Sequence, residues 1–275
     1  MLTRFIMMVA CSCFLLNTAW AASLEKIQEK GSLRVAIYKD FAPYAFKKDN
    51  KIVGIEIEMG EALAKRMGVS MERMLISADE SMEDDLRNAI WKGHYLGGGT
   101  ADVMFHVPVT PAFAADNDQV KIFSPYYREQ LVFVHNTKRI PNLTSLAILA
   151  NHTVGTELDS MASTFLTSTL GGRLRENVRH FLPFEEAITS LQAGKIPAVL
   201  GTQGQIEGLL AEDKANYAVS AIPRAQFRAH WDVGVAVKAE YTALAKEVET
   251  HLNAMIADGT VEKIFQRYHV TLNKP

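Results

Sequence analysis

The segment from Ser32 to Gly68 joins the signals of a strand, a loop and a helix within one short run of chain. Leu33, Val35 and Ile37 alternate with other residues, as in a strand with one buried face. A helix with an apolar face follows and ends at Gly68; its apolar residues are Met59, Ala62, Leu63 and Met67. A strand that passes through a loop into a helix is the unit of a parallel sheet. The segment therefore favours an α/β fold that holds ligands where its strands end.

The same alternation of strands and helices continues along the rest of the chain. The predicted helices are Glu83–Lys92, Ser160–Leu170, Glu185–Ala193, Gln203–Glu212 and Tyr241–Asp258. The predicted strands are Asp102–Val107, Leu131–His135, Thr153–Gly155, Pro197–Leu200, Tyr217–Ile222 and Val233–Val237. One helix–glycine–strand pattern occurs twice, as AIWKGHYLGGGTADVM and as SLQAGKIPAVL, which indicates two similar lobes. The sequence thus predicts an α/β class with largely parallel sheets.

The first 22 residues have the features of a secretory signal peptide. Arg4 precedes an apolar run from Phe5 to Leu16, and Ala19-Trp20-Ala21 is a small-residue cleavage signal, so we expect cleavage near Ala21-Ala22. The apolar run is shorter than the roughly 20 residues that a membrane helix needs, and no later run reaches that length. We expect a protein that is exported to the periplasm.

Both cysteines, Cys11 and Cys13, lie inside the predicted signal peptide. The mature chain therefore has no thiol for a disulfide, a zinc–thiolate site or a catalytic nucleophile. A lipoprotein would need one of these cysteines as its first mature residue, which would cut the apolar run short. We expect an unanchored protein.

Charge and histidine spacing exclude several other classes of function. The formal net charge is −2, and it becomes −3 when the signal peptide removes one positive charge, Arg4. This balance provides no field for nucleic acid or for a membrane surface. The histidines are scattered, and their spacing indicates no metal site. We expect no metal and no cofactor.

Four segments, in this order and spacing, resemble the periplasmic solute-binding proteins of the polar amino-acid class, bacterial family 3. They are Ser32–Gly68, Ala101-Asp102-Val103, Phe123-Ser124-Pro125-Tyr126-Tyr127 and Ile188–Val199. The resemblance implies the type II periplasmic-binding-protein fold, with two mostly parallel sheets flanked by helices and joined by two crossing hinge strands. It places residues 23–130 and 228–275 in lobe 1 and residues 131–227 in lobe 2, with crossings near Leu131–Thr137 and Phe227–Lys238.

The resemblance also implies a function that is binding rather than catalysis. A monomer would capture a small polar or aromatic solute in the cleft between the lobes by hinge closure. It would then present the solute to a membrane partner, an ABC permease. Two further binding functions are open: an accessory protein of a periplasmic quinoprotein dehydrogenase, and a partner of a membrane sensor. An enzyme similar to cyclohexadienyl dehydratase, with Glu157 as its acid, is the remaining alternative.

The resemblance places the first candidate ligand contacts after the first and second strands. Asp40, Phe41 and Tyr44 match the family's aromatic loop, although such rings also serve as hydrophobic staples. His106, Pro108 and Thr110 occupy the second cleft wall, where a lone histidine is often a structural hydrogen-bonding residue. The His94–Gly99 loop adds flexible backbone, either as a cleft rim, a partner contact or a structural turn.

The other candidate contacts lie near the hinge and in lobe 2. Glu157, Ser160 and Ser163 stand at a predicted helix start, where hydroxyl and N–H groups bind polar oxygens or merely cap the helix. The remaining candidates are Tyr126, Arg128, Thr202, Gln203 and Trp231.

Two departures from the family pattern bear on the solute. Phe113 or a neighbouring alanine stands where the family has an arginine that clamps the ligand carboxylate. Gly201 begins the stretch where members that hold an α-ammonium group have an aspartate. Arg128 is the candidate replacement for the clamp. With both usual anchors missing, an ordinary α-amino acid is disfavoured, and we expect a neutral or aromatic-rich cleft with optional charges.

Overall fold

The structure is a computed structural model that describes residues 18–211, 213, 215–223 and 229–275, with side chains from residue 23 onwards. Most of the predicted signal peptide lies outside the described residues. The same holds for the predicted helix end at Glu212 and for the first two residues of the predicted crossing Phe227–Lys238. No helix in the described ranges is long and apolar enough to cross a membrane.

The described chain forms two compact units. Unit 1 comprises the described residues up to Lys39, with Glu56–Tyr126 and Val233–Val261. Unit 2 comprises Asp40–Ile55, Tyr127–Asp232 and Glu262–Pro275. This division differs from the predicted lobes, because the described residues 40–55, 127–130, 229–232 and 262–275 belong to unit 2, whereas the prediction placed them in lobe 1.

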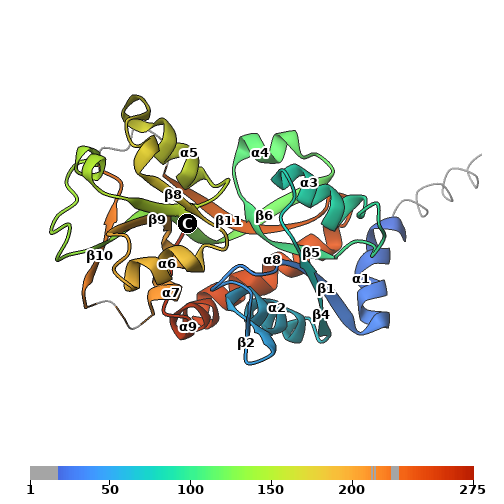
Figure 1. The fold of residues 1–275 in the computed structure, drawn as a ribbon. Helices are drawn as coiled ribbons and strands as arrows, with labels where there is room; N and C mark the ends of the chain where they lie inside the picture. Colours follow the sequence, from blue (N-terminus) through green and yellow to red (C-terminus); the bar gives the residue numbers. More distant parts are fainter. Residues whose placement is uncertain (1–17, 212, 214, 224–228) are drawn as a thin grey trace, which may run out of the picture. The chain divides into compact units, whose positions relative to one another are not determined.

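Unit 1 is built on a sheet with the strand order β4-β1-β5-β11 (Figure 1). β1 (Ser32–Tyr38) pairs in parallel with β4 (Ser70–Ile76) and β5 (Val103–Pro108), and β11 (His230–Lys238) is antiparallel to β5. The alternating apolar residues of β1 are completely buried, as the sequence predicts. The unit's helices are α1 (Thr18–Lys30), α2 (Ile55–Arg66), α3 (Met82–Leu86), α4 (Pro111–Asp116) and α8 (Thr242–Ala257), and a π-helical turn, Arg87–Trp91, extends α3.

Unit 2 is built on a sheet with the strand order β10-β6-β9-β7-β8. β7 (Val154–Glu157) pairs in parallel with β8 (Val178–Phe181) and β9 (Ala198–Thr202), while β6 (Val120–Asn136) is antiparallel to β9 and to β10 (Tyr217–Ala221). The helices are α5 (Met161–Ser168), α6 (Glu185–Gln192), α7 (Gln203–Leu210) and α9 (Thr260–Arg267). Shorter elements are the hairpin β2 (Phe46–Lys48) and β3 (Lys51–Val53) and the 3₁₀ turns Leu146–Asn151, Thr169–Gly172 and Arg175–Asn177.

The alternation of side chains along β6 and β9 divides the core of unit 2 into two layers. Leu131 and Phe133 face one apolar cluster, which includes Leu166 of α5. Val132 and Val134 face the other cluster, which packs against α6 and α7. Because successive strand residues point to opposite faces, each strand supplies both layers. The fold is therefore of the predicted α/β class, with helices flanking parallel strand pairs in each unit, β4-β1-β5 in unit 1 and β9-β7-β8 in unit 2.

A buried tyrosine explains why residues 40–55 belong to unit 2. Tyr44 is fully buried, and its hydroxyl donates a hydrogen bond to Glu129. Gly204 of α7 makes room for this ring, because a Cβ there would lie 2.0 Å from the Tyr44 hydroxyl oxygen. At the other end of the chain, the Thr271 amide donates to Glu207 Oε2 of α7 at 2.6 Å. Both contacts attach segments that are distant in sequence to one helix of unit 2.

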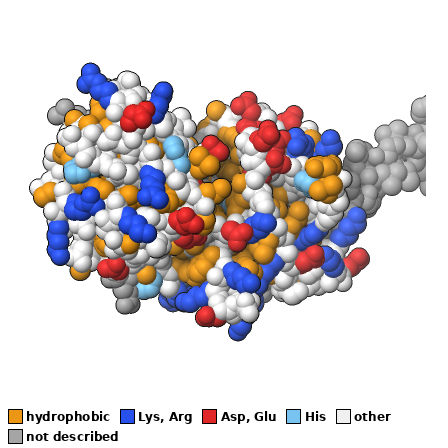
Figure 2. Space-filling model, in the orientation of Figure 1, with side chains coloured by type: hydrophobic (Ala, Val, Ile, Leu, Met, Phe, Trp, Pro, Cys, Tyr) orange, Lys and Arg blue, Asp and Glu red, His pale blue; other side chains and the backbone are white. Residues whose placement is uncertain are grey.

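The face shown in Figure 2 carries basic and acidic side chains interspersed with hydrophobic ones. Charges of both signs therefore share this face, in agreement with the small net charge of the sequence.

Gly204→Ala should destabilise the protein, because the added Cβ would meet the Tyr44 hydroxyl group. We expect a loss of about 1–3 kcal/mol in the free energy of unfolding, which is typical of overpacking. Gly60→Ala in α2 is the matched control, because its Cβ would press on the flexible end of Met71. Urea denaturation of both variants measures the difference.

A double variant tests whether the Tyr44 hydroxyl is the cause. Adding Tyr44→Phe to Gly204→Ala removes the nearest clashing atom, so the two changes together should cost less than the sum of their separate costs. Strictly additive losses would show that the contact does not determine the packing of this loop.

Candidate functional site

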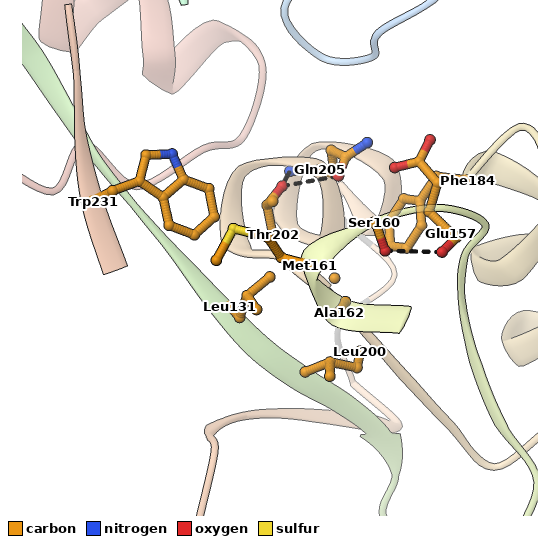
Figure 3. A pocket seen from close by; sticks show the side chains of 11 residues that line it. Leu131, Glu157, Ser160, Met161, Ala162, Phe184, Leu200, Thr202, Gln205 and Trp231 are labelled. Atoms are coloured by element: carbon orange, nitrogen blue, oxygen red, sulfur yellow. Dashed lines mark hydrogen bonds between the residues drawn. The ribbon is translucent and has the colours of Figure 1, made fainter. Parts of the chain in front are cut away.

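A cavity of about 120 Å³ lies within unit 2, where β7 and β9 end and α5 and α7 begin (Figure 3). It is lined by Leu131, Glu157, Ser160, Met161, Ala162, Phe184, Leu200, Gly201, Thr202, Gln205 and Trp231. The carboxyl ends of parallel strands are where open α/β sheets usually hold ligands. The cavity therefore joins four residues that the sequence suggested as candidates: Glu157, Ser160, Thr202 and Trp231.

Glu157 is the charged residue among the described residues that line this cavity. Its side chain is half-buried at the end of β7 and receives a hydrogen bond from the side chain of Gln205. Burial raises the pKa of the Glu157 carboxyl group, the Gln205 bond opposes that shift, and the charge of nearby Glu185 adds to it. An ionised Glu157 thus pays a desolvation cost that a cation in the cavity would offset.

Phe184 occupies the space above Gly201. A Cβ at Gly201 would lie 2.3 Å from Cζ of the Phe184 ring. The end of β9 can therefore approach this ring only because residue 201 has no side chain. Phe184 itself is buried and precedes α6. The glycine that begins the stretch where the family pattern has an aspartate is therefore matched to an aromatic ring, which leaves no room for an acid at residue 201.

The remaining walls of the cavity are mainly apolar. Figure 3 shows Glu157 and Phe184 at one end, Trp231 at the other and Met161 between them. Met161 is about half exposed, at 52%, which leaves its side chain available to a ligand. The cavity therefore has a charged end and an apolar end.

The two hydroxyl residues of the cavity act as helix caps. Ser160 accepts a hydrogen bond from the Ser163 amide at 3.1 Å and donates to the Glu157 carbonyl oxygen at 2.8 Å. Thr202 accepts from the Gln205 amide at 3.4 Å and donates to Gln205 Oε1 at 3.0 Å. Capping, the alternative that the sequence favoured for Ser160, describes both residues.

Ser163 and Gln203 lie outside the lining of this cavity. The Ser163 hydroxyl is 2.8 Å from Nε2 of His180 on β8. Gln203 is buried, donates to Glu207 at 2.6 Å and accepts from Gln130 and Asn273. A ligand contact at either residue stays a prediction.

Arg128 is engaged by an acid in unit 2. Its Nε lies 2.7 Å from Asp232 Oδ1, and a second guanidinium nitrogen lies 3.2 Å from Oδ2. The hydrogen bond to Asp232 raises the pKa of Arg128. Because both prongs of the guanidinium already hold a carboxylate, this geometry opposes the expectation that Arg128 replaces the missing carboxylate clamp.

In unit 1, two of the predicted residues converge on a buried glutamate. Glu56, at the start of α2, is completely buried, and its Oε1 accepts a hydrogen bond from Tyr126 at 2.6 Å. Nδ1 of His106 lies 2.7 Å from the same oxygen, and His106 has a left-handed backbone with φ of 63°. Among the described residues, Glu56 Oε2 has no hydrogen-bond partner. This geometry is that of the structural histidine that the sequence left open; a ligand contact there stays a prediction.

The other predicted residues have the following places. Pro108 ends β5, and Thr110 caps α4 by accepting from the Phe113 amide at 3.2 Å. Asp40 is exposed, and Phe41 packs against Tyr44 with ring centroids 4.9 Å apart. Tyr44 has no exposed face for a solute, and its packing within unit 2 accounts for its position.

A second cavity, of about 360 Å³, lies in unit 1 beside β4 and α3 and includes His94 of the glycine-rich loop. Its buried acid, Asp85, accepts hydrogen bonds from the Tyr38 hydroxyl at 2.5 Å and the Asp79 amide at 2.8 Å. Within the described ranges, no three His, Cys, Asp or Glu side chains gather closely enough to hold a metal ion.

Sequence reasoning missed Phe184, Met161 and Gln205 as cavity residues. Phe184 and Met161 are apolar residues at predicted helix starts, where the pattern indicates core packing. Gly201 was the available signal, because a glycine at a strand end often marks the close approach of another group. The sequence alone does not say which group approaches.

Glu157→Gln should raise the melting temperature more at pH 8 than at pH 4. The folded state binds the Glu157 proton more tightly than the unfolded chain does, because the pKa is raised on folding. The destabilising contribution is therefore absent below the ordinary carboxyl pKa of about 4.3 and develops as the pH rises through the raised pKa. Glu186→Gln, which removes an exposed charge from α6, is the control. An equal effect of Glu157→Gln at both pH values would contradict the prediction.

Comparison with known proteins supports both the fold and the family. The sequence profile of the bacterial extracellular solute-binding proteins, family 3, matches residues 33–271. The arginine-binding extracellular protein ArtP of Bacillus subtilis (strain 168) is 27% identical over 162 residues, which are 57% of this chain and 55% of ArtP. The match thus spans about half the length of that relative.

Two solved structures show the same fold. The ancestral cationic amino acid solute-binding protein AncCDT-1 is 21% identical with a TM-score of 0.72, over 90% of this chain and 99% of that one. A substrate-binding protein of an amino acid ABC transporter from Streptococcus pneumoniae Canada MDR_19A, bound to L-arginine, is 22% identical with a TM-score of 0.65, over 91% and 99% of the two chains. With its profile matched from residue 33 to residue 271, the chain belongs to the bacterial extracellular solute-binding proteins, family 3.

Proposed function

We propose that the chain captures a small solute with the unit 2 cavity and presents it to an ABC permease in the membrane. The family is a solute-binding one, so capture is the activity that the cavity has to explain. The hinge closure that the sequence suggests is part of the proposal. Release to a permease would complete a transport function.

The residues that line the unit 2 cavity are the main support for this proposal. Ligand sites are concave, mainly apolar and equipped with a few polar groups that orient the ligand. The unit 2 cavity has this composition, with Glu157 and Gln205 at the polar end and Trp231 at the apolar end. Its half-exposed Met161 adds an adaptable apolar surface.

Arginine, the ligand named for two of the similar proteins, is not the solute that we propose for this chain. ArtP is described as arginine-binding, and an arginine-bound structure shares the fold. Here Phe113 stands in or beside the family's arginine position, and the ring of Phe184 excludes an acid at Gly201. The contacts that hold an α-amino acid in the family pattern are therefore replaced, and we propose a different solute.

Met161→Ala should weaken solute binding without unfolding the protein. Loss of a partly exposed apolar contact costs on the order of 1 kcal/mol, so the affinity should fall about fivefold. Native mass spectrometry of protein purified from its own periplasm would identify the retained solute and the fraction bound. Titration of the stripped protein with that solute would then give the affinity of each variant.

Leu158→Ala is the matched control for Met161→Ala. Leu158 is also an exposed apolar residue, at 43%, but it does not line the cavity. Wild-type affinity is expected for this variant. If Met161→Ala and Leu158→Ala bind the solute equally well, the cavity is not the capture site.

The solute-loaded protein should stimulate ATP hydrolysis by its permease. The measurement uses an ABC transporter that co-purifies with the solute-loaded protein, reconstituted in lipid vesicles. We expect stimulation with loaded wild-type protein and less with Met161→Ala at the same solute concentration, because fewer molecules are loaded. The absence of any stimulation by loaded protein would contradict the permease as its partner.

A further inference from the structure

The described residues that line the unit 2 cavity carry negative charge and no positive charge. Glu157 is the ionisable residue among the described lining residues, and no lysine, arginine or histidine accompanies it there. Arg128, the cation that the sequence suggested as a clamp, is paired with Asp232 through two hydrogen bonds. The cavity therefore provides an anion and no described cation.

The neutral groups of the cavity also leave little for a carboxylate to bind. The Ser163 and Gln205 amides, which would meet an anion at the starts of α5 and α7, donate to the Ser160 and Thr202 hydroxyls instead. Both hydroxyls donate in turn to oxygens of the protein. An anionic group at these two amides would have to break these bonds, and in the cavity it would lie near the carboxylate of Glu157.

The fixed orientation of Gln205 leaves Glu157 as an acceptor. Gln205 Oε1 accepts from Thr202 at 3.0 Å, and the Gln205 side chain donates to Glu157. A carboxylate has about four acceptor positions, so one amide donor does not saturate Glu157. A ligand that donates hydrogen bonds from a cationic group would complete this coordination.

The surfaces beside Glu157 suit the organic part of such a cation. The Phe184 ring lies at the same end of the cavity, and Met161 and Trp231 continue the wall away from it (Figure 3). Aromatic faces attract organic cations and also pack against alkyl chains. The cavity, at about 120 Å³, is comparable to an engineered cavity of about 150 Å³ that holds benzene, so the bound group is small.

We propose that the unit 2 cavity binds a small alkylammonium ion that lacks an α-carboxylate, with the ammonium group on Glu157 and the alkyl group along Phe184, Met161 and Trp231. This inference rests on the proposed function and names the solute class for the same cavity. It assigns Glu157 as the residue that selects charge. Phe184, over Gly201, is the residue that leaves no room for an acid at residue 201.

Three probes with the same five-carbon chain separate charge from apolar contact. n-Pentylammonium has the charge, 1-pentanol is its neutral counterpart, and L-norleucine is a zwitterion with one further carbon, the carboxylate. Isothermal titration calorimetry at pH 7.5 on the full mature chain, stripped of retained solute, measures each affinity. We expect n-pentylammonium to bind at least tenfold more tightly than either of the other two probes.

Glu157→Gln should abolish this preference and leave the weak binding of 1-pentanol in place. Glu186→Gln is the matched control, because it removes the same charge from an exposed position of α6 outside the cavity. It should retain the preference. A far-ultraviolet circular dichroism spectrum and the melting temperature of each variant confirm that it is folded.

Several results would overturn the inference while the proposed function stands. One is that 1-pentanol binds as tightly as n-pentylammonium, or that L-norleucine binds more tightly. Another is that Glu157→Gln still prefers n-pentylammonium. The last is that no probe binds, although the affinity for the retained solute falls in Met161→Ala. If the wild-type protein retains and binds no solute at all, the proposed function itself fails.

Discussion

The packing of unit 2 depends on the burial of one carboxylate, Glu129. Its oxygens accept hydrogen bonds from the Tyr44 and Tyr127 hydroxyls and from the Gln130 and Gly204 amides. A fully buried charge is tolerated only when its acceptor positions are satisfied in this way. The donors come from the aromatic loop, from β6 and from the start of α7, so satisfying Glu129 joins three segments that are distant in sequence.

Glu129 and Glu157 are two acids of unit 2 that differ in their hydrogen bonds and in their exposure. We assign a structural role to Glu129 and propose a binding role for Glu157. Glu129 accepts hydrogen bonds from two tyrosine hydroxyls and two backbone amides and has no exposed surface, whereas Glu157 accepts from Gln205 and lines an open cavity. The cost of desolvation applies to both, but only Glu157 is placed where a solute can offset it. The proposed binding of a cation at Glu157 rests on that difference between the two acids, and burial is the main cause of the raised pKa of Glu157.

Much of the fold was predictable because its signals are local. Alternating apolar residues indicated β1, the predicted strand Asp102–Val107 overlaps most of β5, and glycine stops indicated the ends of α2 and α6. β4 was missed because it lies at a sheet edge with half-exposed residues that do not alternate clearly. The grouping of residues 40–55 with unit 2 depends on contacts of Tyr44 with Glu129 and Gly204, which no local pattern indicates.

The sequence by itself determined the α/β class, the family and the two departures at Phe113 and Gly201, because each is a matter of residue type, order and spacing. Only the tertiary structure decided what those departures mean. It placed the Phe184 ring over Gly201, paired Arg128 with Asp232 and brought Glu157 to an apolar cavity. These outcomes depend on contacts between residues that are far apart in the chain. No local pattern shows which distant side chain will pack beside a residue such as Gly201.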